Sequence, residues 1–367
     1  MADKPYRYLL VGSGWRSGVF LKLARLFPER LEATGVVSHT QDRADQVAAE
    51  TGLPTSTNVA ELVKRSDPDF VVVLLPWDIA PKVSAEVAGA GKPVLCETPP
   101  ALDLDGLRWV WGQVGDVGRV ASAEQYLRYP GHAARLKVLR SGLIGSPQAV
   151  HVSQSHMYHE FSIIRHFLGV GLSSLTVNAF NTSVRLVEPQ DYGDWIDSDG
   201  TAAPIEPTEL DNNFAHLVFD QGGWGTYDFA MRQWWNPLRV DRVVVNGARG
   251  QLLDNSVTWL ETNRRVLGGE IFRRYGGDEM TFEPRELDHI AFGREILWTN
   301  HWLGGHLTDD DLAVADHLAA TGAWALDEGP SPYSLAEACH DHAITLAVEE
   351  SIASGRPVRV EQLPWQR

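Results

Sequence analysis

Cysteine is scarce in this chain of 367 residues, which contains only Cys96 and Cys339. Two thiols so far apart exclude a disulfide-rich secreted scaffold, and we expect both to be buried and reduced. Basic residues are in the minority, because 32 Lys and Arg stand against 48 Asp and Glu, for a formal net charge of -16. Such an acidic chain repels nucleic-acid phosphates and anionic lipids, so we expect neither as a partner.

Long apolar runs are also missing. No stretch is long enough to span a membrane, and the N-terminus enters a strand-like run without a signal-peptide pattern. We therefore expect a soluble, cytoplasmic protein. Its length is sufficient for two domains and a large core.

What the sequence does contain is a glycine-rich turn near its start. The apolar run Tyr6–Val11 ends at Gly12-Ser13-Gly14, and an amphipathic helical pattern follows. A strand, a tight turn and a helix start present backbone N–H groups and the positive end of the helix to a pyrophosphate. Gly12 permits the turn and Gly14 lets phosphates approach, although the third glycine, Gly18, comes one position late. This pattern predicts a dinucleotide site; the alternative is an ordinary Gly-rich turn of another α/β protein.

Strands and helices alternate over the first third of the chain, with strands expected at 31–38, 70–75, 93–96 and 119–123 and helices at 15–27, 42–51, 79–90 and 103–111. This alternation predicts right-handed βαβ crossovers and a doubly wound parallel sheet. Ligands bind beyond the carboxyl ends of such strands. We therefore predict a Rossmann domain over residues 1–121, with cofactor contacts at Gly12, Gly14, Trp15, Arg16, Ser38, His39, Arg43, Leu75, Pro76, Trp77, Glu97, Thr98 and Gln125.

The pattern changes after about residue 121. Separated β-like runs at 148–154, 175–180, 214–219, 225–229, 239–246 and 251–253 predict an open, mostly antiparallel sheet. Helical patterns cover 131–141, 158–168, 309–325 and 334–354, and the acidic segment 188–211 is expected to be a long loop. We predict an α/β protein whose residues 122–367 form an α+β domain for substrate binding and oligomerisation. An open sheet face favours a homodimer or homotetramer.

The end of the second strand bears on the choice between NAD and NADP. An acidic residue there would bind the ribose hydroxyls of NAD. This chain has Ser38-His39-Thr40 instead, with Arg43 soon after. With no carboxylate at the tip to repel a 2′-phosphate, the pattern favours NADP or loose discrimination. A merely solvated turn, or Asp42 turning inward, is the alternative.

Three motifs together resemble one family. They are the glycine turn, the segment Lys92–Pro99, and Tyr158-His159 ahead of the helical run that ends at Gly169. In this order they are similar to the glucose–fructose oxidoreductase, inositol dehydrogenase and rhizopine-catabolism family (Gfo/Idh/MocA), over nearly the whole chain. The resemblance implies a Rossmann domain, a second domain with an open sheet, a nicotinamide cofactor and sugar-like or polyol substrates. It also implies that His159 is the equivalent of the family's catalytic histidine.

Two positions depart from the family pattern. Glu97-Thr98-Pro99 stands where the family usually has Glu-Lys-Pro, and Thr98 offers a hydroxyl but no positive charge. The aspartate often found four residues before the histidine is Ser155 here. One of three familiar catalytic positions is therefore intact.

The candidate reaction needs a base for a hydroxyl proton and a carbon held against a nicotinamide. Imidazole titrates near neutrality, so His159 suits proton transfer, with Tyr158 and Thr98 as further catalytic candidates; a structural histidine is the alternative. Aromatic faces stack on sugar rings, although most tryptophans serve packing. The candidate substrate contacts are Arg128, Tyr158, His159 and Trp234. Because the histidines at 151, 156, 159 and 166 follow no zinc motif, we expect no metal site.

Three functions stay open. The first is an NAD(P)-dependent oxidoreductase, of the EC 1.1.1 type, that acts on a sugar, polyol or derivative. The second is a redox-neutral lyase or glycosidase that uses the nicotinamide only transiently. The third is a non-catalytic sensor of nucleotide and sugar, which the missing lysine and aspartate favour.

Overall fold

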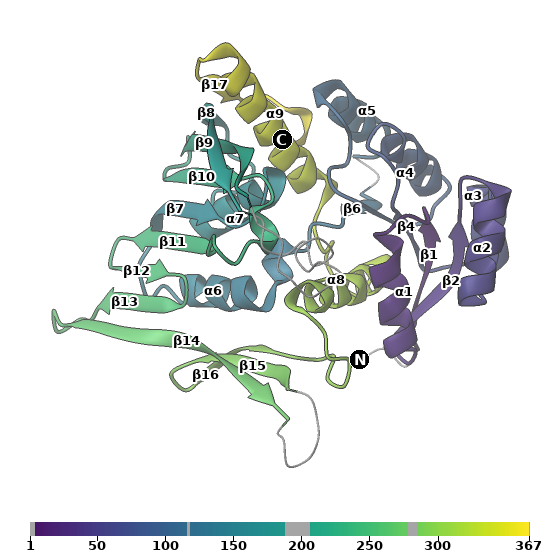
Figure 1. The fold of residues 1–367 in the computed structure, drawn as a ribbon, viewed down its shortest axis with the longest axis horizontal. Helices are drawn as coiled ribbons and strands as arrows, with labels where there is room; N and C mark the ends of the chain where they lie inside the picture. Colours follow the sequence, from purple (N-terminus) through teal and green to yellow (C-terminus); the bar gives the residue numbers. More distant parts are fainter. Residues whose placement is uncertain (1–3, 116–117, 188–205, 278–284, 367) are drawn as a thin grey trace. The chain divides into compact units, whose positions relative to one another are not determined.

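The computed structural model describes residues 4–115, 118–187, 206–277 and 285–366, and the chain divides into two compact units (Figure 1). Unit 1 comprises 1–135, 272–340 and 364–367, whereas unit 2 comprises 136–271 and 341–363. This division differs from a single boundary after residue 121. Three elements contribute residues to both units: α6 (Pro130–Arg140), β14 (Val266–Gly276) and α9 (Leu335–Ser354).

Unit 1 contains a six-stranded parallel sheet in the order β3-β2-β1-β4-β5-β6. The strand order reverses between β1 and β4, which pair from Tyr8↔Phe70 to Val11↔Val73. Leu9, Leu10 and β4 are fully buried, as expected for strands covered on both faces. The strands are β1 (Tyr6–Val11), β2 (Leu31–Val37), β3 (Thr55–Ser56), β4 (Phe70–Val73), β5 (Val94–Cys96) and β6 (Val120–Ser122).

The helices of unit 1 begin and end at residues suited to those positions. Thr40, Asn58 and Asp103 each accept a hydrogen bond at a helix start, and Gly52 ends α2 with φ 71°. Cys96 and Cys339 are buried and form no disulfide. The helices around the sheet are α1 (Ser17–Leu26), α2 (Gln41–Thr51), α3 (Val59–Ser66), α4 (Ala80–Gly89), α5 (Leu104–Val114) and the short 3₁₀ turn η1 (Tyr126–Arg128).

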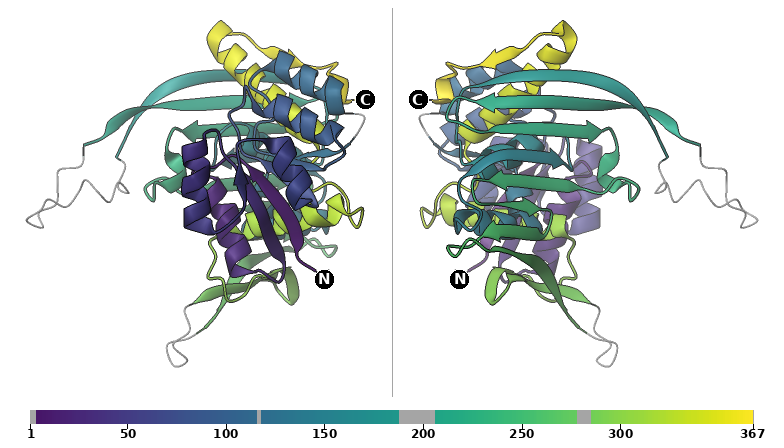
Figure 2. Two further views of the ribbon diagram at one scale, coloured as in Figure 1. Left: turned by 90° about the vertical axis from the view of Figure 1, so that its right-hand side faces the viewer. Right: turned by 90° about the vertical axis from the view of Figure 1, so that its left-hand side faces the viewer.

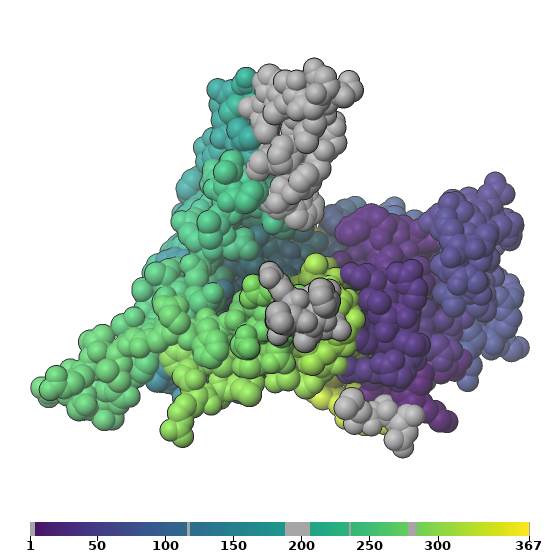
Figure 3. All heavy atoms as spheres, turned by 60° about the horizontal axis from the view of Figure 1, so that its bottom comes forward, coloured from purple at the N-terminus to yellow at the C-terminus, as the bar shows by residue number. Residues whose placement is uncertain are grey.

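A late segment of the chain completes unit 1. Helix α8 (Asp309–Ala325) starts with a capping box between Thr308 and Asp311 and packs beside α1. Figure 3 shows the yellow-green C-terminal part of the chain lying against the purple N-terminal part. Lys22 on α1 contacts the carboxylate of Asp311 at 2.7 Å. The strands β15 (Glu286–Phe292) and β16 (Glu295–Thr299) and the turn η3 (Pro364–Gln366) also belong to this unit.

The second sheet has eleven strands, in the order β16-β15-β14-β13-β12-β11-β7-β10-β9-β8-β17. Only β7 and β10 pair in parallel among its strand pairs with a described register. The predicted class, a Rossmann domain joined to a mostly antiparallel α+β domain, is therefore confirmed. The strands of unit 2 are β7 (Pro147–Ser153), β8 (Leu175–Leu186), β9 (Thr208–Phe219), β10 (Trp224–Ala230), β11 (Arg242–Gly247), β12 (Gly250–Leu253), β13 (Ser256–Leu260) and β17 (Val358–Val360).

Helix α7 (Tyr158–Leu168) packs on β7 and β10, and the opposite face of these strands is turned away from α7 (Figure 2). On that open face, Trp224 lies against His151 and His216, with ring centroids 4.9 and 5.4 Å apart. Large apolar side chains are exposed there, among them Val218 and Trp224.

The expected long loop over 188–211 needs a correction at its end. Residues 188–205 lie outside the described part of the chain, but Thr208–Asp211 form the start of β9. They pair with β8 from Leu186↔Thr208 to Ser183↔Asp211. Most of their side chains are exposed, so the apolar alternation that predicts a strand is weak here.

A buried ion pair connects helices α7 and α9 within unit 2. Nε of Arg165 on α7 donates to Oδ1 of Asp341 on α9 at 2.7 Å, and Nη1 donates to the Gly171 carbonyl at 2.6 Å. The Arg165 side chain is fully buried and that of Asp341 is 3% exposed. Removing one partner of such a pair leaves an uncompensated charge in the protein interior.

We therefore expect Arg165→Met to lower the free energy of unfolding by about 3–5 kcal/mol, because Asp341 loses its counter-ion. Urea denaturation followed by circular dichroism measures this loss. The matched control is Arg242→Met in the same unit, whose ion pair with Asp228 is solvent-accessible and is worth less than about 1 kcal/mol. Equal losses in both variants would contradict the role given to the buried pair.

Candidate functional site

The glycine turn of unit 1 has the geometry that a bound dinucleotide needs. Gly12 has φ 118°, and a Cβ added there would lie 2.3 Å from the Leu74 carbonyl oxygen. Only glycine therefore fits at the end of β1. A Cβ on Gly14 would meet nothing within 4 Å, so the chain leaves open space beside that residue.

The start of α1 offers backbone donors beside this space. Arg16 is the N-cap of α1, and its side chain does not cap the helix. Among the described residues, the N–H groups of Trp15 and Arg16 have no protein acceptor, whereas those of Ser17 and Gly18 bond to Gly14 and Trp15. Free N–H groups at the positive end of a helix bind phosphate oxygens. The turn thus fits the pyrophosphate of a dinucleotide.

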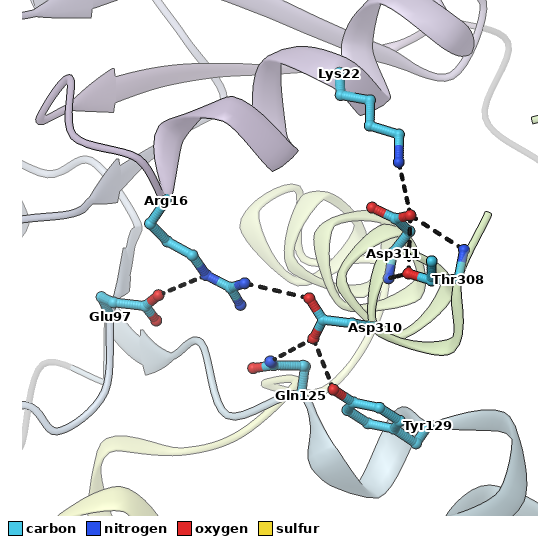
Figure 4. A network of polar contacts seen from close by, with 8 residues as sticks. All are labelled: Arg16, Lys22, Glu97, Gln125, Tyr129, Thr308, Asp310 and Asp311. Carbon is cyan, nitrogen blue, oxygen red and sulfur yellow. Dashed lines mark hydrogen bonds and ion pairs between the residues drawn. The ribbon is translucent and has the colours of Figure 1, made fainter. Parts of the chain in front are cut away.

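A polar network joins this turn to the carboxyl ends of β5 and β6 (Figure 4). Nε of Arg16 donates to Oε1 of Glu97 at 2.9 Å, and Nη1 donates to Oδ2 of Asp310 at 3.3 Å. The other oxygen of Asp310 accepts from Gln125 Nε2 at 3.0 Å and from the Tyr129 hydroxyl at 2.9 Å. The structure therefore brings Arg16, Glu97 and Gln125 together, and adds Asp310, which the sequence did not single out.

The end of β2 contacts the same turn from the other side. Ser38 donates to the hydroxyl of Ser13 at 3.0 Å, and Nη2 of Arg43 donates to the Ser13 carbonyl at 3.0 Å. His39 is exposed. Beyond the end of β4, Leu75 is half-buried, whereas Pro76 and Trp77 are exposed, and in the glycine turn Trp15 is 88% exposed. The remaining sequence candidates for cofactor binding thus follow β2 and β4, except Trp15, which lies in the turn between β1 and α1.

Thr98 and Arg128, two further candidates from the sequence, lie in different environments. The backbone N–H of Thr98 donates to Oε2 of Glu97 at 3.1 Å, so its segment is held next to the network. Arg128 lies in η1, where burial lowers its pKa and the nearby carboxylate of Asp316 opposes this effect. Asp316 belongs to α8, so this predicted substrate contact already has a carboxylate near it.

The catalytic candidates of unit 2 gather at the first turn of α7. The ring centroids of Tyr158 and His159 lie 4.5 Å apart. The ring centroid of His156 lies 5.0 Å from that of His159 and 5.0 Å from that of Trp234. Trp234 Nε1 donates to Nδ1 of His156 at 3.1 Å. The structure therefore brings together the predicted candidates Tyr158, His159 and Trp234. It adds His156, which was named from the sequence only among the histidines that follow no zinc motif.

Glu160 fixes the start of α7. Its Oε1 accepts from the backbone N–H groups of Gln154, at 2.7 Å, and Ser155. The carboxyl group is fully buried, and burial raises its pKa well above the ordinary value. The backbone N–H of Met157, which has φ 47°, donates to the Tyr227 hydroxyl at 3.3 Å. These contacts set the backbone that carries His156 and His159.

His156 is held in its neutral form. Burial lowers its pKa to about 3, with a smaller contribution from His159. Because Nδ1 accepts from Trp234, Nε2 carries the proton of the neutral ring. His156 can therefore donate a hydrogen bond from Nε2 throughout the neutral pH range.

No three His, Cys, Asp or Glu side chains converge as a metal site among residues 4–115, 118–187, 206–277 and 285–366. Over the same residues, none of the helices combines the length and apolar character needed to cross a membrane.

The strand order and the turn define a two-unit α/β protein whose first unit has a Rossmann-type nucleotide-binding fold. Residues 6–123 match the family model described as "Oxidoreductase family, NAD-binding Rossmann fold". The chain is therefore similar to the Gfo/Idh/MocA family, as its motifs predict, and the match lies in its nucleotide-binding part.

Curated relatives match part of the chain. Inositol 2-dehydrogenase 1 of Saccharopolyspora erythraea is 29% identical over 174 residues, which are 41% of this chain and 52% of that protein. The 1,5-anhydro-D-fructose reductase of Ensifer adhaerens is 32% identical over 123 residues, or 33% of this chain and 37% of the reductase. The chain thus matches about half or less of the length of these two relatives.

Solved structures show that the fold extends over the whole chain. An NAD binding oxidoreductase from Klebsiella pneumoniae superposes with a TM-score of 0.68, at 18% identity, covering 98% of this chain and 100% of that one. Levoglucosan dehydrogenase in complex with NADH and L-sorbose gives a TM-score of 0.66 at 17% identity, with the same two coverages.

Substitutions at the two glycines of the turn should have different effects, one on folding stability and the other on cofactor binding. We expect Gly12→Ala to destabilise the chain by about 2–4 kcal/mol, because Cβ meets the Leu74 carbonyl at a positive φ. Gly14→Ala has space for its Cβ, so it should fold normally and weaken the binding of NAD(P)H. Thermal denaturation and fluorescence titration measure the two effects. Native-like NAD(P)H affinity in Gly14→Ala would contradict a close approach of the phosphates.

The low pKa of His156 predicts an acid-sensitive fold. Between pH 6.5 and about 3 the unfolded chain binds a proton at this residue and the folded chain does not, so stability falls as the pH falls. His156→Gln keeps an acceptor for Trp234 but cannot titrate. Urea midpoints between pH 7 and pH 4 should therefore decline less steeply in the variant. An unchanged decline would show that His156 does not contribute.

Proposed function

We propose that the chain is an NAD(P)-dependent oxidoreductase that acts on a secondary hydroxyl or keto group of a sugar, polyol or sugar derivative. The observation that carries the proposal is the imidazole of His159, 7% exposed, at the first turn of α7 beside Tyr158 and His156. The match of residues 6–123 to the NAD-binding family model and the glycine turn support a nicotinamide partner for this imidazole. The named activities of the relatives, on inositol and on anhydrofructose, support the substrate class.

In the proposed reaction His159 moves the proton. During oxidation of a secondary alcohol, the imidazole accepts the hydroxyl proton while the carbon loses a hydride; during reduction of a ketone it returns that proton. The bound nicotinamide supplies the hydride acceptor or donor. Tyr158 and His156 position the imidazole, and Trp234 and Arg128 are the candidate substrate contacts.

For the cofactor, we propose NADP, or acceptance of both forms. The support is the guanidinium of Arg43, which lies at the turn next to Ser38, together with a strand tip that has no acidic residue. A 2′-phosphate needs a cation of this kind, whereas NAD selectivity uses a carboxylate. For assembly, the exposed apolar residues of the open sheet face support a homodimer or homotetramer.

The experiment follows nicotinamide absorbance with a panel of sugars, polyols and 3-keto-sugars, and analyses the products by mass. We expect His159→Ala to lose at least about a hundredfold in turnover while its affinity for NAD(P)H stays native, because proton transfer is lost and the nucleotide turn is not changed. His301→Ala, at an exposed histidine, is the matched control and should keep its turnover.

Two outcomes would contradict the proposal. Cleaved sugars without any net change in absorbance would indicate redox-neutral lyase or glycosidase chemistry. Tight nucleotide binding with every sugar unchanged would indicate a sensor.

A further inference from the structure

The strand order tells which half of a dinucleotide the Arg16 network faces. In a sheet of order 3-2-1-4-5-6 the dinucleotide crosses the point of reversal, with its adenosine ribose at the end of β2. Its other half, which carries the nicotinamide, then lies over the ends of β4, β5 and β6. Glu97 follows β5 and Gln125 follows β6, so the network borders the nicotinamide half.

The network carries one net negative charge. Glu97 and Asp310 contribute two carboxylates and Arg16 contributes one guanidinium. Gln125 and Tyr129 donate hydrogen bonds to Asp310 as neutral groups. Each carboxylate oxygen accepts at least one hydrogen bond, because Oε2 of Glu97 binds the backbone N–H of Thr98. Thr98 itself adds no charge.

The three charged side chains of the network are partly buried, which limits their movement and their screening by solvent. The side chains of Arg16, Glu97 and Asp310 are 17%, 21% and 38% exposed. Burial lowers the pKa of Arg16, but the carboxylates of Glu97 and Asp310 raise it by more, so the guanidinium stays charged. Burial next to Asp310 also raises the pKa of Tyr129, which stays a hydroxyl donor.

An oxidised nicotinamide ring carries a positive charge and a reduced ring carries none. The adenosine, the ribose groups and the phosphates are the same in both forms. A fixed negative charge beside the ring therefore stabilises the oxidised form selectively, and the difference appears in the ratio of the two dissociation constants.

We propose that the Arg16–Glu97–Asp310 network sets the relative affinity for oxidised and reduced cofactor, with Asp310 as the residue that makes the network negative. This inference rests on the proposed function only in its first step, the binding of a nicotinamide dinucleotide. Its chemical consequence is that the bound reduced cofactor becomes a better hydride donor, which favours reduction of a keto group.

Isothermal titration of native protein and variants with both redox forms of the cofactor tests the proposal. In Asp310→Asn the dissociation constant of the reduced form divided by that of the oxidised form should fall roughly three- to tenfold. Because the ratio is taken within one variant, a general weakening of the turn cancels. Asp309→Asn is the matched control: it removes the same charge from the same helix turn, but Asp309 pairs with Arg273 instead of Arg16. Its ratio should stay within about twofold of native.

Glu97→Gln provides a second, independent variant, since it also brings the network to zero net charge and should lower the ratio in the same direction. If both Asp310→Asn and Glu97→Gln fold and keep the native ratio, the proposal is wrong. An equal fall in Asp309→Asn would also overturn it, because the effect would then come from net charge alone. If native protein binds neither redox form, the proposed function itself fails.

Discussion

The first turn of α8 is the constraint on which the nucleotide-binding unit depends. Three consecutive carboxylates, Asp309, Asp310 and Asp311, each contact a different cation, on β14, the glycine turn and α1 respectively. Acidic residues at a helix start also interact favourably with the helix dipole. The same side chains therefore stabilise the helix and attach its first turn to β14, the glycine turn and α1.

Much of the fold could be predicted because its signals are local. The β-branched run of β4, the Asp103 cap and the Gly52 stop each lie within a few residues of the element they define, and α7 and α8 begin and end where the sequence predicts. Helix α3 was missed although Asn58 caps its start, whereas other missed elements lack such signals. β3 has two residues, and β14 is so exposed that it shows little apolar alternation.

In the candidate site, too, local signals could be predicted from the sequence and long-range contacts could not. Gly12, Arg16 and Glu97 were predicted because a strand end marks each of them, and their roles toward a cofactor stay predictions. Asp310 was missed because its partner, Arg16, is 294 positions away in the chain, and no periodicity records a contact of that range. His156 was visible only as one of several histidines; its hydrogen bond with Trp234 joins residues 78 positions apart.

The discontinuity of unit 1 also affects how the chain folds during synthesis. Domains generally fold as they leave the ribosome, N-terminal part first. Here α8, whose acidic turn binds Arg16 and Lys22, emerges only after the strands β7–β13 of the other unit have been translated. At ordinary translation rates that delay is on the order of ten seconds. Throughout this interval the nascent N-terminal sheet lacks its last helix, and Arg16 has only Glu97 as a counter-ion.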